Sequence, residues 1–368
     1  RDLPVNRGQN NPDRIRYDYY RDRTVAFEAF KAGAYDFRHE LTSSQWATGY
    51  DVPAIRSGEM KRETISHSRP TGMQCFVYNT RREKFQDPAL REALAYAFDF
   101  EWSNKNLFYG IYERPKSFFE NSELASTGLP SAEELKILEP MRGTIPDRVF
   151  TDEYQPPVTD GSGTPRANLR KGLDILRNAG WKITGGKLID PKSGKPLEIE
   201  FLLSSPAFER IVLPFTKNLE RLGVTSTVRT VDSAQYQNRM DSFDFDVTTD
   251  VFGQSSSPGN EQRDFWGSEA ADRPGGRNTI GIKDPAIDKL VDLVIAAQTW
   301  EDLVTRCRAL DRVLLWHHFV IPQWASTSFN IAWWNKFGRP EKTPKYEIGF
   351  TSWWVDPALA AKLKKSGG

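Results

Sequence analysis

The fold is decided by residues 71–110, which read TGMQCFVYNTRREKFQDPALREALAYAFDFEWSNKNLFYG. The segment from Gln74 to Tyr78 is rich in aromatic and β-branched residues, which predicts a strand. After a polar turn, Asp87 and Pro88 supply an N-cap and a first helical position where a missing N–H costs nothing, so a helix begins there. Apolar residues then recur at helical spacing on one face, which would pack against a sheet: Leu90, Ala93, Leu94, Ala97 and Phe98.

The same alternation of strand and helix continues further along the chain. The ranges 198–203, 224–231 and 245–252 have the composition and period of strands, and helical patterns over 208–222 and 236–240 separate them. This order is typical of an α/β domain, and a largely parallel sheet is its most economical arrangement.

Length and composition limit the classes of function. A chain of 368 residues is long enough for about two domains. Its net charge of +1 gives no general attraction to nucleic acid or to anionic membranes. The sequence contains no run of about 20 apolar residues that could span a membrane. Cys75 and Cys307 are too few for a disulfide framework, and we expect two buried free thiols.

A longer motif surrounds the predicted helix. The run N-T-R-R-x-x-F-x-D-P-x-L-R-E-A-L-x-x-A-x-D, residues 79–99, resembles the lobe-entry segment of the family 5 extracellular solute-binding proteins, the oligopeptide- and dipeptide-binding type. With FDFEWSNKNLFYG, residues 98–110, it looks like the branch of that family associated with microcin C and peptide uptake. The resemblance covers essentially the whole chain and is most specific over 74–102, 231–266 and 305–324.

The resemblance implies a fold and a division into lobes. The expected fold is α/β and similar to type II periplasmic binding proteins, with one complete α/β lobe and part of a second. Residues 72–318 would form the smaller lobe, while 1–71 and 319–368 would belong to the larger one. Family members carry a signal peptide and further residues before the matching region. We therefore expect this chain to be the C-terminal part of a longer secreted protein.

The resemblance also implies a function. The expected protein is the periplasmic substrate-binding component of an ABC importer in a Gram-negative cell, and it would capture a peptide or peptide-like ligand between two lobes that close by hinge bending. Its partners would be the inner-membrane permease subunits and, where the chain is cut, the missing N-terminal part of the same protein. The sequence also leads us to expect no cofactor, no metal and no nucleic-acid partner.

The first candidate ligand wall is FDFDVTTDVFGQSSSPGNEQRDFWGS, residues 243–268, where a strand runs into a loop rich in Ser and Gly. In the wider family, an Asp in this loop pairs with the α-amino group of the peptide, a few residues before a proline that matches Pro258. Here Gln254 and Ser255 occupy that neighbourhood, and the nearest acids are Asp250 and Glu261. This departure favours a blocked amine, a modified peptide or another amide-rich ligand. The expected site residues in this wall are Phe252, Gln254, Ser255, Ser256, Asn260 and Glu261.

Two further groups of site residues are expected outside that loop. Gln74, Tyr78, Asn79 and Arg81 lie at the strand and turn near the expected crossing between lobes. Arg239 could bind a ligand carboxylate, because a guanidinium group matches that geometry.

Enzymatic function has little support in the sequence. The four histidines, His39, His67, His317 and His318, lack the spacing of a metal site. No nucleophile motif or phosphate loop is present, so no catalytic residue is predicted. The alternative function is a secreted hydrolase or carbohydrate-active enzyme, whose cleft could use the 11 Trp, 12 Tyr and 22 Phe residues. A structural interaction module without a ligand cleft is a third possibility.

Overall fold

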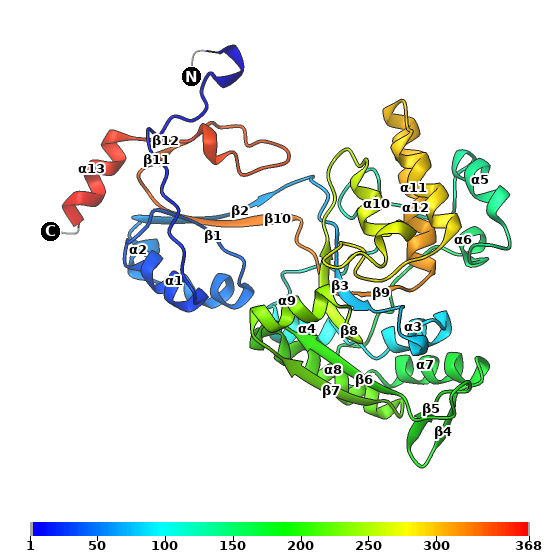
Figure 1. Cartoon of the computed structure of the whole chain (residues 1–368). Helices are drawn as coiled ribbons and strands as arrows, with labels where there is room; N and C mark the ends of the chain where they lie inside the picture. Colours follow the sequence, from blue (N-terminus) through cyan, green and yellow to red (C-terminus); the bar gives the residue numbers. More distant parts are fainter. Residues whose placement is uncertain (1–2, 367–368) are drawn as a thin grey trace. The chain divides into compact units, whose positions relative to one another are not determined.

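The computed structural model of the chain describes residues 3–366, which divide into two compact units. One unit runs from Pro70 to Ala325, and the other comprises the residues before Pro70 and after Ala325 (Figure 1). Each unit has its own sheet and its own hydrophobic core.

The central feature of the Pro70–Ala325 unit is a five-stranded sheet in the order β7-β6-β8-β3-β9. Strand β6 is parallel to β7 and β8, whereas β3 is antiparallel to both β8 and β9. Four of the five strands therefore run in one direction and β3 runs against them. Two of the four pairings are antiparallel, so the sheet is mixed rather than largely parallel as predicted. Its strands are β3 (Met73–Tyr78), β6 (Glu198–Leu203), β7 (Thr225–Thr230), β8 (Val247–Phe252) and β9 (Val320–Pro322).

Helices cover both faces of this sheet. Since successive side chains of β3 point to opposite sides, this strand packs against helices on each face. Phe76 and Tyr78 pack with α3 (Pro88–Ala95), α7 (Arg166–Asn178) and α8 (Glu209–Arg221). Met73, Cys75 and Val77 pack with α10 (Glu261–Trp266), α11 (Pro285–Ile295) and α12 (Trp300–Trp316). The remaining elements named for this unit are α4 (Phe100–Leu107), α5 (Ala132–Leu138), α6 (Arg148–Thr151), α9 (Ser233–Asp241), β4 (Lys182–Thr184) and β5 (Lys187–Ile189).

The local signals in the opening stretch determine where its elements begin. Asp87 Oδ1 accepts a hydrogen bond of 2.9 Å from the Ala89 amide, and Pro88 is the first residue of α3, as predicted. The five apolar positions of the predicted helix face are all buried: Leu90, Ala93, Leu94, Ala97 and Phe98. Cys75 and Cys307 are also buried, and both are free thiols as expected.

The second unit is built on a three-stranded antiparallel sheet in the order β1-β10-β2. One face of the central strand packs with Phe27 and Phe30, and the other packs with Trp353. The elements of this unit are α1 (Arg23–Lys31), β1 (Phe37–His39), α2 (Pro53–Arg56), β2 (Met60–Ser66), β10 (Ser328–Trp334), β11 (Phe337–Gly338), β12 (Trp354–Val355) and α13 (Pro357–Ser366).

One part of the predicted division was wrong. Residues 319–325 were assigned to the larger lobe together with the rest of 319–368, but β9 pairs with β3 in the five-stranded sheet. Val320 and Ile321 are buried there, so pairing and burial keep the chain in this unit until Ala325. The next strand, β10, belongs to the other unit. Two apolar strands follow each other closely here, and their sequences do not specify which sheet each one joins.

Candidate ligand-binding edge

The carboxyl ends of β6, β7, β8 and β9 lie at one edge of the five-stranded sheet, together with the amino end of β3. The register places Phe252 opposite Met73 and Pro322 opposite Cys75. In open α/β sheets, ligands bind beyond the carboxyl ends of the strands, where the loops are free to vary. This edge, called the carboxyl edge below, is therefore the candidate site. Of the predicted site residues, it brings together Gln74 and those of 252–261.

The loop between β8 and α10 supplies polar groups to the carboxyl edge. Ser255, Ser256 and Asn260 are exposed, while Pro258 is buried and anchors the loop. Ser255 Oγ accepts a hydrogen bond of 3.2 Å from the Ser257 amide, which fixes the turn. Asn260 Oδ1 accepts one of 3.0 Å from Arg263 Nη1. The loop thus presents hydroxyl and amide groups on a backbone that local contacts hold in place.

Three side chains beneath this loop form a hydrogen-bonded relay. Trp266 Nε1 donates to Gln262 Oε1 at 2.9 Å, and Gln262 Nε2 donates to Gln254 Oε1 at 2.8 Å. Trp266 and Gln262 are both fully buried. Gln254 Nε2, at the end of the relay, is itself inaccessible to solvent and has no hydrogen-bond partner among the described residues.

A second amide pair lies at the same edge. Gln74 Nε2 donates to Gln323 Oε1 at 3.1 Å, and the backbone N–H of Gln323 donates to the Gln74 carbonyl at 2.9 Å. Gln323 is fully buried, and its Nε2 has no partner within residues 3–366. Both sets of side chains therefore end in an amide nitrogen whose donors are unused, an uncommon state for buried polar atoms.

The two acids nearest the loop are held by protein donors. Asp250 Oδ2 accepts a hydrogen bond of 2.6 Å from Thr279 Oγ1. Glu261 Oε1 accepts from the Gly259 amide at 2.9 Å and from Gln262 Nε2 at 3.2 Å. Glu261, a predicted site residue, thus braces the loop and the relay.

The side chain of Phe252, a predicted site residue, lies in the core rather than on the surface of the carboxyl edge. Phe252 is 1% exposed and packs against Trp266, with 4.8 Å between ring centroids, and against Phe118 at 6.0 Å. As the last residue of β8 it positions the start of the loop, but its ring belongs to the core.

Tyr78, Asn79 and Arg81, also predicted as ligand contacts, lie away from the carboxyl edge and bind protein groups. Because β3 is antiparallel to β8, Tyr78 pairs with Val247 and lies at the opposite end of the sheet from the loop. The Tyr78 hydroxyl donates to the Arg91 carbonyl at 3.1 Å. Asn79 is fully buried and donates from Nδ2 to the carbonyl oxygens of Phe243 and Phe245, each at 2.9 Å.

Arg81 binds the backbone of its own unit. Its guanidinium donates to the carbonyl oxygens of Ala271, Asn278 and Thr279 and stacks 3.8 Å from the Phe243 ring centroid. Burial lowers the pKa of Arg81 to about 10. These contacts stabilise the fold, and they already use the guanidinium N–H donors that a ligand carboxylate would need.

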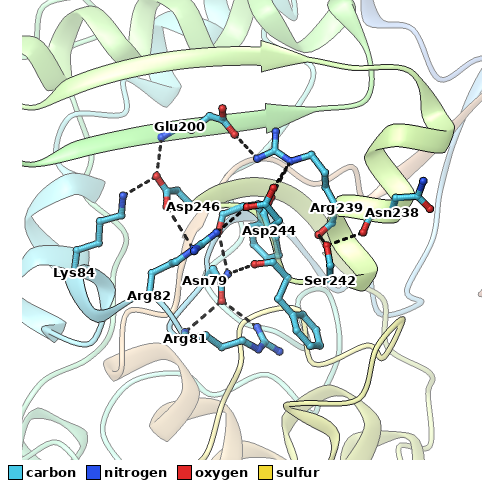
Figure 2. A network of polar contacts seen from close by, with 12 residues as sticks. Asn79, Arg81, Arg82, Lys84, Glu200, Asn238, Arg239, Ser242, Asp244 and Asp246 are labelled. Atoms are coloured by element: carbon cyan, nitrogen blue, oxygen red, sulfur yellow. Dashed lines mark hydrogen bonds and ion pairs between the residues drawn. The ribbon is translucent and has the colours of Figure 1, made fainter.

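Arg239 lies in the same network of polar contacts as Asn79 and Arg81 (Figure 2). Its guanidinium group, predicted to bind a ligand carboxylate, already pairs with carboxylates of the protein. Figure 2 shows its guanidinium pointing toward Glu200 and Asp244, with Nη2 2.6 Å from Glu200 Oε1 and Nε 3.1 Å from Asp244 Oδ2. In the same view Lys84 approaches Asp246 Oδ2 at 2.6 Å. The cations and carboxylates of this network pair with one another, so Arg239 is not available to a ligand without breaking an ion pair.

Sequence reasoning missed three residues of the carboxyl edge: Gln262, Trp266 and Gln323. Gln262 and Trp266 are four residues apart on α10, which places them on one helix face where they can bond. That spacing was visible in the sequence, but a short helix with a buried polar face was not expected. Gln323 was missed because β9 was assigned to the other lobe.

The residues that the structure describes, 3–366, include neither a metal-binding cluster nor a membrane-spanning helix. No group of three or more His, Cys, Asp or Glu side chains could hold a metal ion. None of the helices in this range combines the length and the hydropathy that a membrane span requires.

Comparison with known proteins identifies relatives over nearly the whole chain. The chain is 48% identical over 361 residues to "Probable peptide-binding protein YejA" of Agrobacterium fabrum, which covers 97% of this chain and 59% of the relative. It is 42% identical over 367 residues to "Uncharacterized protein YejA" of Escherichia coli, which covers 98% of this chain and 60% of the relative. The chain thus spans about three fifths of the length of these relatives.

A solved structure shares the fold. The oligopeptide-binding protein AppA of Bacillus subtilis, in complex with a nonapeptide, superposes with a TM-score of 0.66 at 17% identity and covers 91% of this chain and 58% of AppA. At this identity the likeness concerns the fold alone, which is that of solved peptide-binding proteins and agrees with the predicted α/β class. The model of one protein family matches residues 5–273, well over half of the chain. The chain therefore belongs to the bacterial extracellular solute-binding proteins, family 5.

Proposed function

We propose that this chain is part of the substrate-binding component of an ABC importer and that its ligand is a peptide or a peptide-like compound. Membership of family 5 supports the transport role. The name of the Agrobacterium relative, a probable peptide-binding protein, and the nonapeptide bound to AppA support the ligand class. Because the chain spans only part of its relatives, the proposal concerns the protein to which these residues belong.

The observation that carries the proposal is the polar loop between β8 and α10 at the carboxyl edge, whose exposed side chains include hydroxyl and amide donors. A peptide backbone offers one carbonyl acceptor per residue, so an extended peptide can satisfy such donors at several points. The exposed Ser255, Ser256 and Asn260 add groups that adapt to different side chains.

The partners and location follow from the family. We propose that the protein works in the periplasm of a Gram-negative cell and delivers its ligand to inner-membrane permease subunits. A further N-terminal part, which would account for the greater length of the relatives, is included in this proposal. Closure of two lobes on the ligand stays a prediction.

A hydrolase is the weaker alternative. Glycoside hydrolysis needs two carboxyl groups that face the same bond. The acids closest to the loop, Asp250 and Glu261, accept hydrogen bonds from protein groups and brace the local structure. We therefore expect the bound ligand to be released unchanged.

The test is native mass spectrometry of the freshly purified full-length protein, followed by chemical identification of any retained compound. The expected result is a mixture of short peptides or peptide-containing fragments. Incubation with those compounds should give no cleavage product. Retention of an oligosaccharide without peptide, or turnover of the retained compound, would refute the proposal.

A further inference from the structure

The charge of this chain is unevenly distributed. Residues 166–197 comprise α7, the hairpin of β4 and β5, and the loop that follows it. This range contains eight Lys and Arg residues and two Asp, so its net charge is +6, whereas all 368 residues together have +1. All eight cationic side chains are exposed, and they are called the basic patch below: Arg166, Arg170, Lys171, Arg177, Lys182, Lys187, Lys192 and Lys195.

Three consecutive elements bring these cations to one region, where β4 and β5 form a hairpin next to α7 (Figure 1). The Trp181 amide donates to the Leu176 carbonyl at 2.9 Å, so the last turn of α7 leads directly into β4. The loop after β5 lies against the same turn, because a Cβ added to Gly180 would be 3.7 Å from Pro191 Cβ. The helix, the hairpin and the loop therefore form one surface.

The basic patch has a rigid base. Trp181 is 2% exposed and donates from Nε1 to Asp87 Oδ2 at 2.9 Å, which ties the start of β4 to α3. Leu188 of β5 is buried in the core beneath. Successive side chains of a strand alternate, so Lys187 points to the face opposite Leu188, and the pairing of β4 with β5 places Lys182 on that same outer face.

The two acids of this range do not neutralise the basic patch. Asp174 lies 3.2 Å from Arg177, and both side chains are exposed. Asp190 accepts hydrogen bonds from the Lys192 amide and the Ser193 hydroxyl, each at 2.8 Å, so it fixes the loop instead of pairing with a cation. Across the described part of the chain, the other seven cations form no ion pair with a carboxylate.

The basic patch offers charge without the groups that other anionic partners require. Trp181 is the only aromatic residue of 166–197 and is buried, so no ring is available to stack on the bases of a nucleic acid. Ile183, 47% exposed, is the only exposed large apolar side chain in this fully described range, whereas protein interfaces are centred on aromatic and apolar anchors. Exposed lysines and arginines on three neighbouring elements suit a surface covered with phosphate groups.

We propose that the basic patch binds the surface of a membrane that contains anionic phospholipids. Its ammonium and guanidinium groups donate hydrogen bonds to the phosphate oxygens of the headgroups, and no apolar segment enters the bilayer. The inference goes beyond the proposed function, because the basic patch and the candidate ligand site are separate. The loop after β5 leads into the amino end of β6, whereas the carboxyl edge lies at the other end of that strand. A protein held through the basic patch therefore keeps its carboxyl edge free of lipid contacts.

The test measures how much of the full-length protein floats with phospholipid vesicles in a density gradient. Vesicles of equal parts phosphatidylglycerol and phosphatidylcholine should bind the protein in about 20 mM salt and release it in about 300 mM salt, since salt screens the attraction. Vesicles of phosphatidylcholine alone should bind at least about tenfold more weakly. A variant that combines Lys182→Gln, Lys187→Gln, Lys192→Gln and Lys195→Gln should lose about a hundredfold or more in affinity for the anionic vesicles.

A control variant loses the same charge elsewhere. It carries Lys→Gln at four exposed positions close to residues that pack on the other face of the sheet: Lys116, Lys136, Lys283 and Lys289. It should bind anionic vesicles like wild type. Both variants should unfold in urea like wild type and keep its peptide affinity, because the exchanged side chains are exposed and lie outside the carboxyl edge.

Several outcomes would overturn the inference. The first is that wild type does not bind anionic vesicles in low salt, and the second is that both variants lose affinity equally. Binding only to vesicles that carry permease subunits would assign the basic patch to a protein partner. Release by inorganic phosphate at constant ionic strength would assign it to free phosphate. None of these outcomes concerns the retained peptide, so this inference and the proposed function fail separately.

Discussion

Ser126 and Asp311 are 185 residues apart in the sequence, yet Asp311 Oδ2 accepts hydrogen bonds from both the Ser126 amide, at 2.9 Å, and the Ser126 hydroxyl, at 2.6 Å. Ser117 Oγ donates to the same oxygen at 2.8 Å, and the Phe118 amide donates to Oδ1 at 2.8 Å. Asp311 is fully buried on α12. This carboxylate therefore ties the long segment after α4 to the helix layer that covers one face of the sheet.

Burial of Asp311 makes stability depend on pH. Desolvation raises the pKa of Asp311 to about 6, although its hydrogen bonds act in the opposite direction. A raised carboxyl pKa means that this group favours the folded state most below its ordinary pKa near 4, and that the contribution is lost as pH rises through about 6. We expect the unfolding free energy to lose about 3 kcal/mol from this group between pH 4 and pH 7.

The measurement is urea unfolding of wild type and Asp311→Asn at pH 4, 5, 6 and 7. The advantage of wild type over Asp311→Asn should be larger at pH 4 than at pH 7 by roughly that amount. Asp292→Asn, at an exposed position where the carboxylate pairs with Arg263, should run parallel to wild type. A constant difference between wild type and Asp311→Asn across this range would contradict the prediction.

Local signals in the sequence were enough to predict the helices and strands, but they were not enough to predict which residues share the carboxyl edge. The Asp87–Pro88 start of α3 and the strand ranges of β6 and β7 depend on neighbouring residues, and they were predicted closely. Gln254 and the loop were predicted as site residues because the resemblance marks that position. Tyr78 and Arg81 were predicted near the crossing between lobes, but the structure places them at the far end of the sheet from the loop, because the direction of β3 in the sheet is a tertiary property.

Arg81 offers a test of that correction. Arg81→Lys keeps the charge but cannot reproduce the planar set of donors that reaches Ala271, Asn278 and Thr279. Stability should fall by on the order of 3 kcal/mol, since buried carbonyl groups lose their donor. Peptide affinity should stay within about twofold of wild type, as calorimetry can determine. Arg82→Lys, in which a half-exposed side chain changes, is the matched control. Loss of affinity without loss of stability would return Arg81 to the ligand site.

Gly72 holds the start of β3 against the end of β8. Its φ is +68°, and an added Cβ would lie 2.3 Å from the Phe252 carbonyl oxygen and 2.9 Å from Gly253 Cα. Gly72→Ala should therefore displace the backbone that leads to Gln254, destabilise the fold by about 3 kcal/mol and weaken peptide binding.

Gly143 provides the matched comparison for Gly72. It has a φ of +85° but nothing within 4 Å of an added Cβ, so Gly143→Ala should cost only the backbone strain of about 1 kcal/mol. Unfolding in urea measures both variants. If both substitutions lower the unfolding free energy equally, the backbone relieves the contact between the added Cβ and the Phe252 carbonyl oxygen without a loss of stability.

Thiol reactivity can report on both the core and the loop. Cys75 and Cys307 are fully buried, and desolvation raises the pKa of Cys75 well above its usual value and that of Cys307 to about 12. Since the thiolate is the reactive form, both should react with a disulfide reagent at pH 8 more than about a hundredfold more slowly than a free thiol. In Ser256→Cys, the exposed loop position should add one thiol that reacts quickly. Saturation with the retained peptide should slow the reaction of that thiol at least tenfold if the loop contacts ligand. Fast labelling of the wild-type thiols would contradict the buried core, and unchanged labelling of Ser256→Cys with peptide bound would place this part of the loop outside the site.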